Sequence, residues 1–269
     1  TNKKNLLLCI GNDGKAYRLP VASLEEVSRT ARGQYINSLL SASGDVVIVA
    51  VIGVERSKTD NGIVLFFTER GQIKRIAISD LVTSRNCVQA VKVKEDDRII
   101  NAVYSENDDG LAYVATANGK LLKFGYGKFR SRGRAAGTQK CIGLANGDYA
   151  VSADIITDND SILTITNTGI GKKSPADSYT MHGVGTQGVT NYKVTKGVTV
   201  AAVLTVRDED DILVACDNGK LIRVHADAFR DTGRSSKGVT LVNLEGHESV
   251  VGASAVMRDD GPSDTETQE

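Results

Sequence analysis

The chain has 269 residues and balances 33 Lys and Arg against 33 Asp and Glu, so its formal net charge is zero. Hydrophobic residues make up 41%, enough for a sizeable core, but no run approaches the 18 consecutive apolar residues of a membrane-spanning helix. Glycine is frequent (27) and proline scarce (3), which is typical of short strands joined by tight turns. Thr1 is not an initiator methionine and no signal peptide follows it, so we expect a piece of a longer chain.

Five consecutive segments share one layout: an apolar run, a glycine turn, a second apolar run, a polar loop, a third run, another turn and a fourth run. The spacings between successive turn glycines are 57, 48, 50 and 50 residues. Four short strands at a period near 50 predict the blade of a propeller. The turn glycines of the five repeats are Gly14, Gly71, Gly119, Gly169 and Gly219.

We therefore predict an all-β, propeller-like disc of about five four-stranded blades with very little helix. It forms a single domain over residues 1–257, and the acidic, apolar-poor tail 258–269 is expected to be disordered. The repeats cover about 5–54, 63–106, 111–157, 161–206 and 211–257. The expected core-strand residues include Leu6, Leu8, Leu65, Val114, Leu163 and Leu213.

Basic residues recur in the polar loop between the second and third runs of most repeats. The segment from Gly119 to Lys140 carries seven Lys or Arg residues and no acidic residue. The second repeat is shorter and offers only Arg85. In chain order, the candidate binding residues are Arg29, Arg32, Lys128, Arg130, Arg132, Arg134, Lys140, Lys172, Lys173, Arg230, Arg234 and Lys237.

A glycine also recurs in four of these loops, where positive φ would let the backbone approach a ligand closely. Arginine beside exposed backbone N–H groups suits phosphate oxygens, and charge spaced around a rim suits a long polyanion. The links between repeats are acidic instead, so a neutral chain is expected to fold into a strongly polarised disc. The loop glycines are Gly33, Gly137, Gly188 and Gly238.

Cysteine and histidine give no catalytic or metal-binding pattern. The four cysteines are far apart, lie in apolar runs and are expected to be reduced, which favours the cytosol. The three histidines, His182, His225 and His247, pair with no recurring nucleophile or carboxylate, so we interpret them as surface residues. No phosphate-binding loop or dinucleotide fingerprint occurs, and we expect no cofactor, no metal and no enzymatic activity in this domain alone.

The segments "LLLCIGNDGKAYRLPVASLEEVSRTARGQYINSLL", "IVLFFTERGQIKRIAISDL" and "GKLIRVHADAFRDTGRSSKGVTLVNL" resemble blades of the C-terminal domain of the DNA gyrase A protein and of its topoisomerase IV counterpart. This resemblance implies a β-pinwheel, in which neighbouring blades exchange a strand. It also implies that a basic perimeter binds and bends duplex DNA and presents a segment to the cleavage core of the same polypeptide. The ATPase B subunit of the holoenzyme then drives supercoiling in the bacterial cytoplasm, at the nucleoid.

The sequence departs from the gyrase pattern because the Gln-Arg-Arg-Gly-Gly-Lys-Gly type box is missing, with only "SRTARGQ" and "SRGRAAGTQ" as degenerate echoes. Two explanations remain open: a box-bearing blade precedes Thr1, or the protein is a five-bladed relative without the box. Topoisomerase IV, in which this domain sets substrate preference, is one alternative function. A propeller used for protein contacts is another, although no Trp-Asp or Gly-His blade signature occurs. The isolated domain is expected to be a monomer with no contact to membranes.

Overall fold

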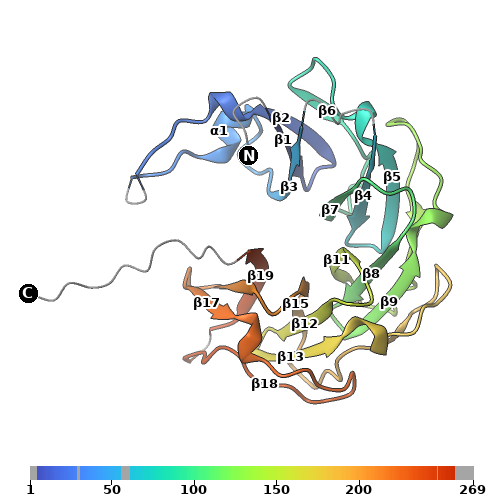
Figure 1. Ribbon diagram of the computed structural model, residues 1–269, viewed down its shortest axis with the longest axis vertical. Helices are drawn as coiled ribbons and strands as arrows, with labels where there is room; N and C mark the ends of the chain where they lie inside the picture. Colours follow the sequence, from blue (N-terminus) through green and yellow to red (C-terminus); the bar gives the residue numbers. More distant parts are fainter. Residues whose placement is uncertain (1–4, 29–30, 56–60, 247, 258–269) are drawn as a thin grey trace, which may run out of the picture.

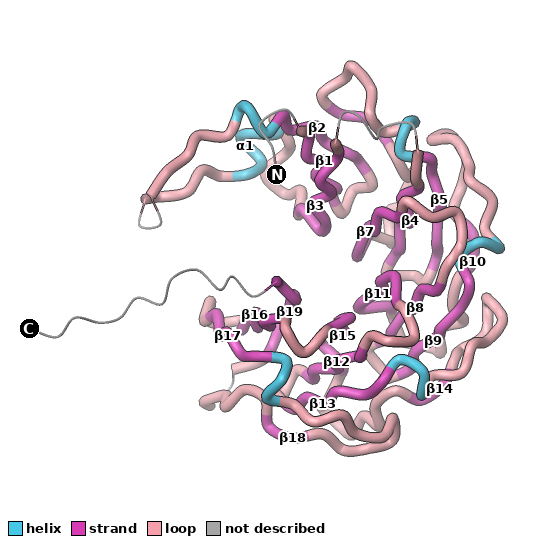
Figure 2. Tube along the Cα trace, viewed as in Figure 1, coloured by secondary structure: helices cyan, strands magenta, loops and turns pink. Residues whose placement is uncertain are grey.

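The computed structural model describes residues 5–28, 31–55, 61–246 and 248–257. The strands form five antiparallel sheets placed side by side around a common centre, in an arc that is open between the fifth sheet and the first (Figures 1 and 2). This confirms the predicted all-β, propeller-like architecture with five blades. The acidic tail, Arg29 and His247 lie outside the described residues.

Helical structure is as rare as predicted. The described residues hold one short α-helix, α1 (Ile36–Leu40), and a single 3-10 turn after the second strand of each repeat. No helix among them is long and apolar enough to cross a membrane. The 3-10 turns cover Val21–Ser23, Ile78–Asp80, Tyr126–Lys128, Ala176–Ser178 and Ala226–Ala228.

A tight hairpin joins the first two strands of each repeat, and its turn glycine has a positive φ in all five repeats. The demand for glycine is both conformational and steric. At Gly119, φ is +75°, and a Cβ atom would lie 2.0 Å from the carbonyl oxygen of Tyr192 in the next repeat. The glycine therefore permits the turn and also lets two repeats pack closely.

The outer strand of a sheet comes from the following repeat, as the resemblance to a pinwheel implied. In the first sheet the spatial order is β3-β1-β2-β6, and β6 belongs to the second repeat. The same exchange gives the orders β10-β5-β4-β7, β11-β8-β9-β14 and β15-β12-β13-β18, whereas the fifth sheet is β17-β16-β19. In chain order the strands are β1 (Leu6–Gly11), β2 (Lys15–Pro20), β3 (Ile48–Val54), β4 (Ile63–Thr68), β5 (Gln72–Ala77), β6 (Cys87–Gln89), β7 (Ile99–Ser105), β8 (Leu111–Thr116), β9 (Lys120–Gly125), β10 (Gln139–Lys140), β11 (Ala150–Ile156), β12 (Ser161–Thr166), β13 (Ile170–Pro175), β14 (Val189–Thr190), β15 (Val200–Val206), β16 (Asp210–Cys216), β17 (Leu221–His225), β18 (Val239–Thr240) and β19 (Val250–Met257).

The two ends of the arc differ from the repeat layout. The fifth sheet has three strands, because the described part of the chain has no sixth repeat to supply an outer strand to β17. The third run of the first repeat, for which the layout predicted a strand, forms α1 instead. The Asn37 side chain donates hydrogen bonds to the carbonyl oxygens of Ser43 and Val46, and Leu40 packs with Tyr17. Helix α1 therefore covers the outer face of the first sheet.

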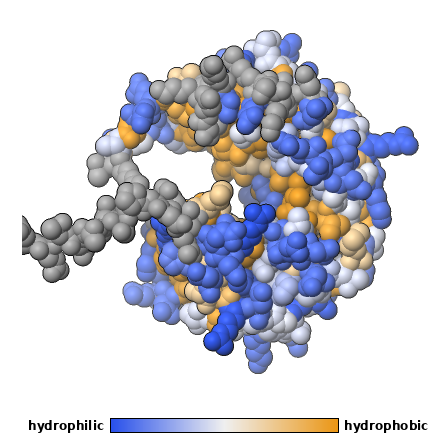
Figure 3. Space-filling view, viewed as in Figure 1, coloured by the Kyte–Doolittle hydropathy of each residue, from blue (hydrophilic) through white to orange (hydrophobic). Residues whose placement is uncertain are grey.

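The hydrophobic core lies between neighbouring sheets. Leu6 and Leu8 of the first sheet pack with Val64 and Phe66 of the second, and equivalent clusters join each later pair. Apolar residues also gather around the centre of the arc, with hydrophilic residues along its rim (Figure 3). Five of the six residues predicted for the core are buried. Leu213 is only half-buried, since in β16 it alternates with the buried Ile212 and Val214, which face the fourth sheet.

Candidate nucleic-acid interface

The loop of the third repeat lies along the outer rim of the second sheet. It begins at the 3-10 turn Tyr126–Lys128, and Phe129 anchors it with its ring edge-on to Phe124, the ring centroids 5.9 Å apart. The backbone N–H of Arg132 then donates to the carbonyl oxygen of Arg75 on β5, at 2.9 Å. Finally, β10 pairs with β5. The loop is thus fixed at both ends to a neighbouring blade.

The basic side chains of this loop point outward without acidic partners. Because Tyr126 and Phe129 are buried, the residues next to them face solvent. None of the five basic side chains forms a salt bridge with another described residue, and all are exposed except Arg134, which is half-buried. These are the predicted binding residues Lys128, Arg130, Arg132, Arg134 and Lys140. The third loop therefore presents five basic side chains that form no salt bridge with another described residue, although Lys140 lines a surface cavity with Glu69, Asp96 and Asp148.

The loop of the fifth repeat follows the same course along the fourth sheet with a lower density of charge. Arg230 and Lys237 are exposed. The guanidinium of Arg234 donates to the carbonyl oxygen of Thr190, at 2.5 Å, which holds it against β14. Asp231 lies in the same loop, 3.9 Å from the ammonium of Lys173. In the first repeat Arg32 is exposed, so the rim has a strong cluster at the third loop and weaker ones at the first and fifth.

Lys172 and Lys173 do not lie on the rim, which corrects the prediction that they face a ligand. Both are in β13 and are almost fully buried. Lys173 bonds to Asp208 at 2.6 Å, and the Lys172 ammonium donates to the Arg234 carbonyl oxygen at 2.5 Å. Two adjacent lysines in a strand point to opposite faces, and here a neighbouring repeat covers each face.

Buried cations and acidic links join successive blades. The fourth residue after the turn glycine is basic in every repeat, and in three repeats it forms a salt bridge to the acidic link of the next one. Lys123 shows the arrangement: its ammonium bonds to Asp158 at 2.6 Å and to the Ala176 carbonyl oxygen at 2.9 Å. The predicted acidic zone is therefore partly neutralised. The other two such pairs are Arg75–Asp108 and Lys173–Asp208.

Two of the four loop glycines have a packing role that the sequence did not predict. Gly188 and Gly238 have positive φ, but their close neighbours are backbone atoms of the preceding blade, at Leu121 and Gly171. At Gly33 and Gly137 φ is not in the left-handed region, and nothing lies within 4 Å of a Cβ atom added there. Gly188 and Gly238 thus allow the loop to join a neighbouring sheet, whereas Gly137 lines a surface cavity, and a close approach of ligand at Gly33 and Gly137 stays a prediction.

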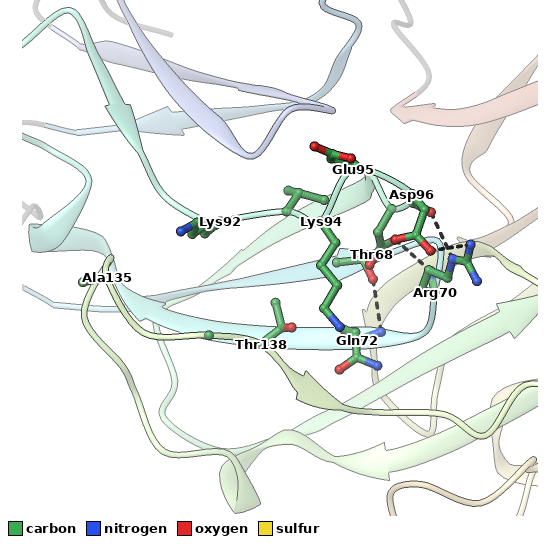
Figure 4. Close-up of a pocket in the computed structure, with 12 residues that line it drawn as sticks. Thr68, Arg70, Gln72, Lys92, Lys94, Glu95, Asp96, Ala135 and Thr138 are labelled. Carbon is green, nitrogen blue, oxygen red and sulfur yellow. Dashed lines mark hydrogen bonds and ion pairs between the residues drawn. The ribbon is translucent and has the colours of Figure 1, made fainter.

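Two basic residues that the sequence reasoning missed lie beside the third loop. Lys92 and Lys94 line a surface cavity of about 1030 Å³ whose other side is formed by Ala135 and Thr138 (Figure 4). An acidic run, Glu95 to Asp97, follows them in the sequence. However, Asp96 pairs with Arg70 at 2.8 Å, and among the described residues neither lysine has a salt-bridge partner. The alternation of valine and lysine in "VKVK" was the sequence feature that could have identified these two lysines.

The histidines and cysteines offer no chemistry to this interface. His182 is exposed, and Nδ1 of His225 lies 2.5 Å from a carboxylate oxygen of the buried Asp211, which also pairs with Arg223. The four cysteines are free thiols, and burial raises the pKa of Cys9 to about 11. No cluster of three or more metal-binding side chains occurs among the described residues. The notable chemistry of this surface is its positive charge.

A family model described as the DNA gyrase C-terminal domain, beta-propeller, matches residues 5–52, 62–105, 113–157, 160–207 and 210–257, one segment for each repeat. The chain belongs to this family. The DNA gyrase A protein of Lawsonia intracellularis is 33% identical over 262 residues, which are 95% of this chain and 32% of that protein. The gyrase A protein of Kosmotoga olearia is 30% identical over 261 residues, 96% of this chain and 32% of that protein. This gyrase-type domain thus spans about a third of the length of these curated relatives.

Solved structures agree on the fold of this gyrase-type domain. The C-terminal domain of a DNA topoisomerase IV superposes with a TM-score of 0.86 at 23% identity, covering 96% of this chain and 80% of that one. A DNA gyrase A C-terminal domain gives a TM-score of 0.79 at 22% identity, covering 96% and 84%. The chain is therefore a C-terminal domain of the type found in gyrase A and its topoisomerase IV counterpart.

Proposed function

We propose that this domain binds duplex DNA along its outer rim, through phosphate contacts that tolerate any sequence, and bends the duplex. The observation that supports this proposal most strongly is the third loop, which carries five basic side chains that form no salt bridge with another described residue. Arginine and lysine that neutralise phosphates release condensed counterions, which provides affinity independent of base sequence. A fixed loop backbone holds these side chains ready for a rigid duplex.

The proposed contact surface extends from the third loop in both directions along the arc. Arg230, Arg234 and Lys237 of the fifth loop continue it on one side, and Arg29 and Arg32 of the first loop on the other. We add Lys92 and Lys94 to it, because they lie unpaired beside the third loop. We remove Lys172 and Lys173 from it, because both side chains are buried.

In the whole protein, the domain presents a bent DNA segment to the cleavage core of its own polypeptide, and a partner B subunit hydrolyses ATP. The domain itself is not catalytic, and it works in the bacterial cytoplasm at the nucleoid. The curated relatives support gyrase rather than topoisomerase IV as the parent enzyme, since those with closely matching sequence are gyrase A proteins.

Replacement of Arg130, Arg132 and Arg134 by alanine tests the interface. We expect weaker binding to unrelated duplexes alike, and a salt slope reduced by about one unit per lost contact. Arg207→Ala is the control, because Arg207 is exposed but already has an acidic partner in Asp160. Fluorescence anisotropy on two unrelated duplexes measures both quantities. Unchanged affinity in the triple variant would refute the proposed interface.

The extent of bending depends on how many clusters hold the duplex. Bending 20–30 base pairs by 40–90° costs on the order of 1–6 kcal/mol, and contacts spread along the arc must offset that cost. With one strong cluster and no box motif, we propose that this domain bends DNA without constraining a full wrap. Relaxing a plasmid around the bound domain and counting the trapped writhe tests this. A writhe as large as that of a box-bearing gyrase domain would contradict the proposal.

A further inference from the structure

Two buried lysines lie directly beneath the two loops that carry arginine at their turns. Lys74 and Lys172 each occupy the third position after a turn glycine, Lys74 in β5 and Lys172 in β13. They are 1% and 2% exposed, respectively, and neither forms a salt bridge with a described residue. A buried ammonium without a counter-ion is costly, so its retention needs a reason.

The ammonium groups bind the backbone of the rim loops. Lys74 donates to the carbonyl oxygens of Arg134 at 2.8 Å, Ala136 at 2.6 Å and Ala90 at 3.0 Å. Lys172 donates to the carbonyl oxygen of Arg234 at 2.5 Å. Each lysine therefore holds a loop of the next repeat from the interior.

The loop segments held in this way share one turn hydrogen bond, which is longer, at 3.4 Å between Thr186 and Gly183, in the loop that no lysine holds. The amide of Ala136 donates to the Gly133 carbonyl oxygen, and the amide of Ser236 donates to that of Gly233, so each loop forms a tight turn. The arginine follows the glycine in both turns, at Arg134 and Arg234. Its carbonyl oxygen faces the buried lysine.

The sheets that have no lysine at this position show that packing does not require one, which supports a functional interpretation of Lys74 and Lys172. The third sheet has the buried Leu122 at the same register, and the loop that follows, "MHGVGTQG", has no arginine. An apolar residue therefore fits this position where the loop above it is not basic. The corresponding residues of the first and fifth sheets are Tyr17 and Ile222.

We propose that Lys74 and Lys172 are positioning residues for DNA binding, which fix the arginine turns and add a buried positive charge that bound phosphate neutralises. This inference rests on the proposed DNA-binding function. The lysines touch no DNA; they act through the loop backbone and through the electrostatic potential of the rim.

The charge of Lys172 should make DNA affinity depend on pH, an effect that a purely structural role of the lysine would not produce. Burial, and secondarily the guanidinium of Arg234, lowers the pKa of Lys172 to about 8. The neighbouring Tyr179 has its pKa raised to about 12 by burial, so it does not titrate in the same range. A phosphate bound at Arg234 favours the protonated lysine, so binding takes up a proton above about pH 8. Affinity is therefore expected to fall as the pH rises from about 7.5 to about 9.5.

The test compares Lys74→Leu and Lys172→Leu, which copy the leucine of the third sheet, with Leu122→Met as the matched control. We expect each lysine variant to bind a duplex about tenfold more weakly, the value of one lost charge-assisted hydrogen bond. Hydrogen exchange should quicken in residues 130–140 for Lys74→Leu and in 230–240 for Lys172→Leu. The pH dependence should flatten in Lys172→Leu, while Leu122→Met keeps the wild-type values.

A second variant covers the case in which Lys172→Leu does not fold. Lys172→Gln keeps a donor without a charge, so it should preserve slow exchange in 230–240 and still lose the pH dependence. Wild-type affinity and pH profile in both lysine variants, with weakened binding in the triple arginine variant, would overturn this inference alone. Wild-type binding in the triple arginine variant as well would overturn the proposed function and this inference with it.

Discussion

Gly119→Ala is expected to destabilise the domain much more than Gly219→Ala, although both glycines occupy the same place in their repeats. Their φ values are similar, +75° and +85°. A left-handed conformation costs an alanine roughly 1–2 kcal/mol, partly offset by about 0.4–1 kcal/mol from a less flexible unfolded chain. This contribution is common to both substitutions and predicts a loss of about 1 kcal/mol for each.

The difference arises from the neighbouring repeat. An added Cβ at Gly119 meets the Tyr192 carbonyl oxygen at 2.0 Å, whereas nothing lies within 4 Å at Gly219, because no further repeat of the described chain packs there. Overpacking typically costs about 1–3 kcal/mol, so Gly119→Ala should lose roughly 2–4 kcal/mol in total. Urea unfolding followed by circular dichroism measures both variants. Equal losses would refute the claim that the turn glycines are required for packing between blades.

Three further outcomes follow from buried groups. In urea unfolding, Asp158→Ala should lower the free energy of unfolding more than Lys123→Met, by up to about 3 kcal/mol, because it leaves the buried Lys123 ammonium without a counter-ion. The carboxylate that Lys123→Met leaves behind faces solvent. The reverse order would contradict the burial argument. Burial raises the pKa of Asp154 to about 6, so the folded state holds a proton that the unfolded state loses near pH 4. The free energy of unfolding of the wild type should accordingly fall, relative to that of Asp154→Asn, as the pH rises from about 4 to about 6. Parallel curves of unfolding free energy against pH for the two proteins would count against this. A thiol reagent should modify Cys87 first and leave Cys141 unmodified in the folded protein, because burial raises the pKa of the Cys141 thiol far more than that of the Cys87 thiol. Mass spectrometry of the labelled peptides identifies the modified site.

Much of the fold could be predicted because hairpins are local. A glycine turn between two apolar runs specifies an antiparallel pair within a dozen residues, and five such pairs at one period specify a ring of blades. Strand exchange is not local: nothing in the residues Gln139–Lys140 tells whether they pair with their own repeat or the preceding one. That feature followed from family resemblance and is confirmed by the pairing of β10 with β5.

The rim charges were predicted less evenly because burial depends on contacts between repeats. The third loop is basic and exposed, as expected, since its charges are dense and no acid lies near them in sequence. Lys172 and Lys173 were misassigned because their strand is covered on both faces by other repeats. For Lys173 a sequence signal did exist: a basic residue lies four positions after every turn glycine, which in a strand of a repeat protein indicates a structural cation. Leu213 shows the opposite error, because the sequence does not reveal that the last sheet lacks a neighbour in the described part of the chain.

The shared outer strands also determine how the arc carries force. Lys140 belongs to the third repeat by its covalent chain and to the second sheet by its hydrogen bonds, so tension applied there by a stiff duplex enters two sheets at once. The same holds at Thr190 and Thr240, where β14 and β18 pair with the preceding sheets. Interlocked links of this kind distribute a load along the whole arc. Separation at one blade boundary would therefore require an exchanged strand to leave its sheet in addition to the parting of the packed faces.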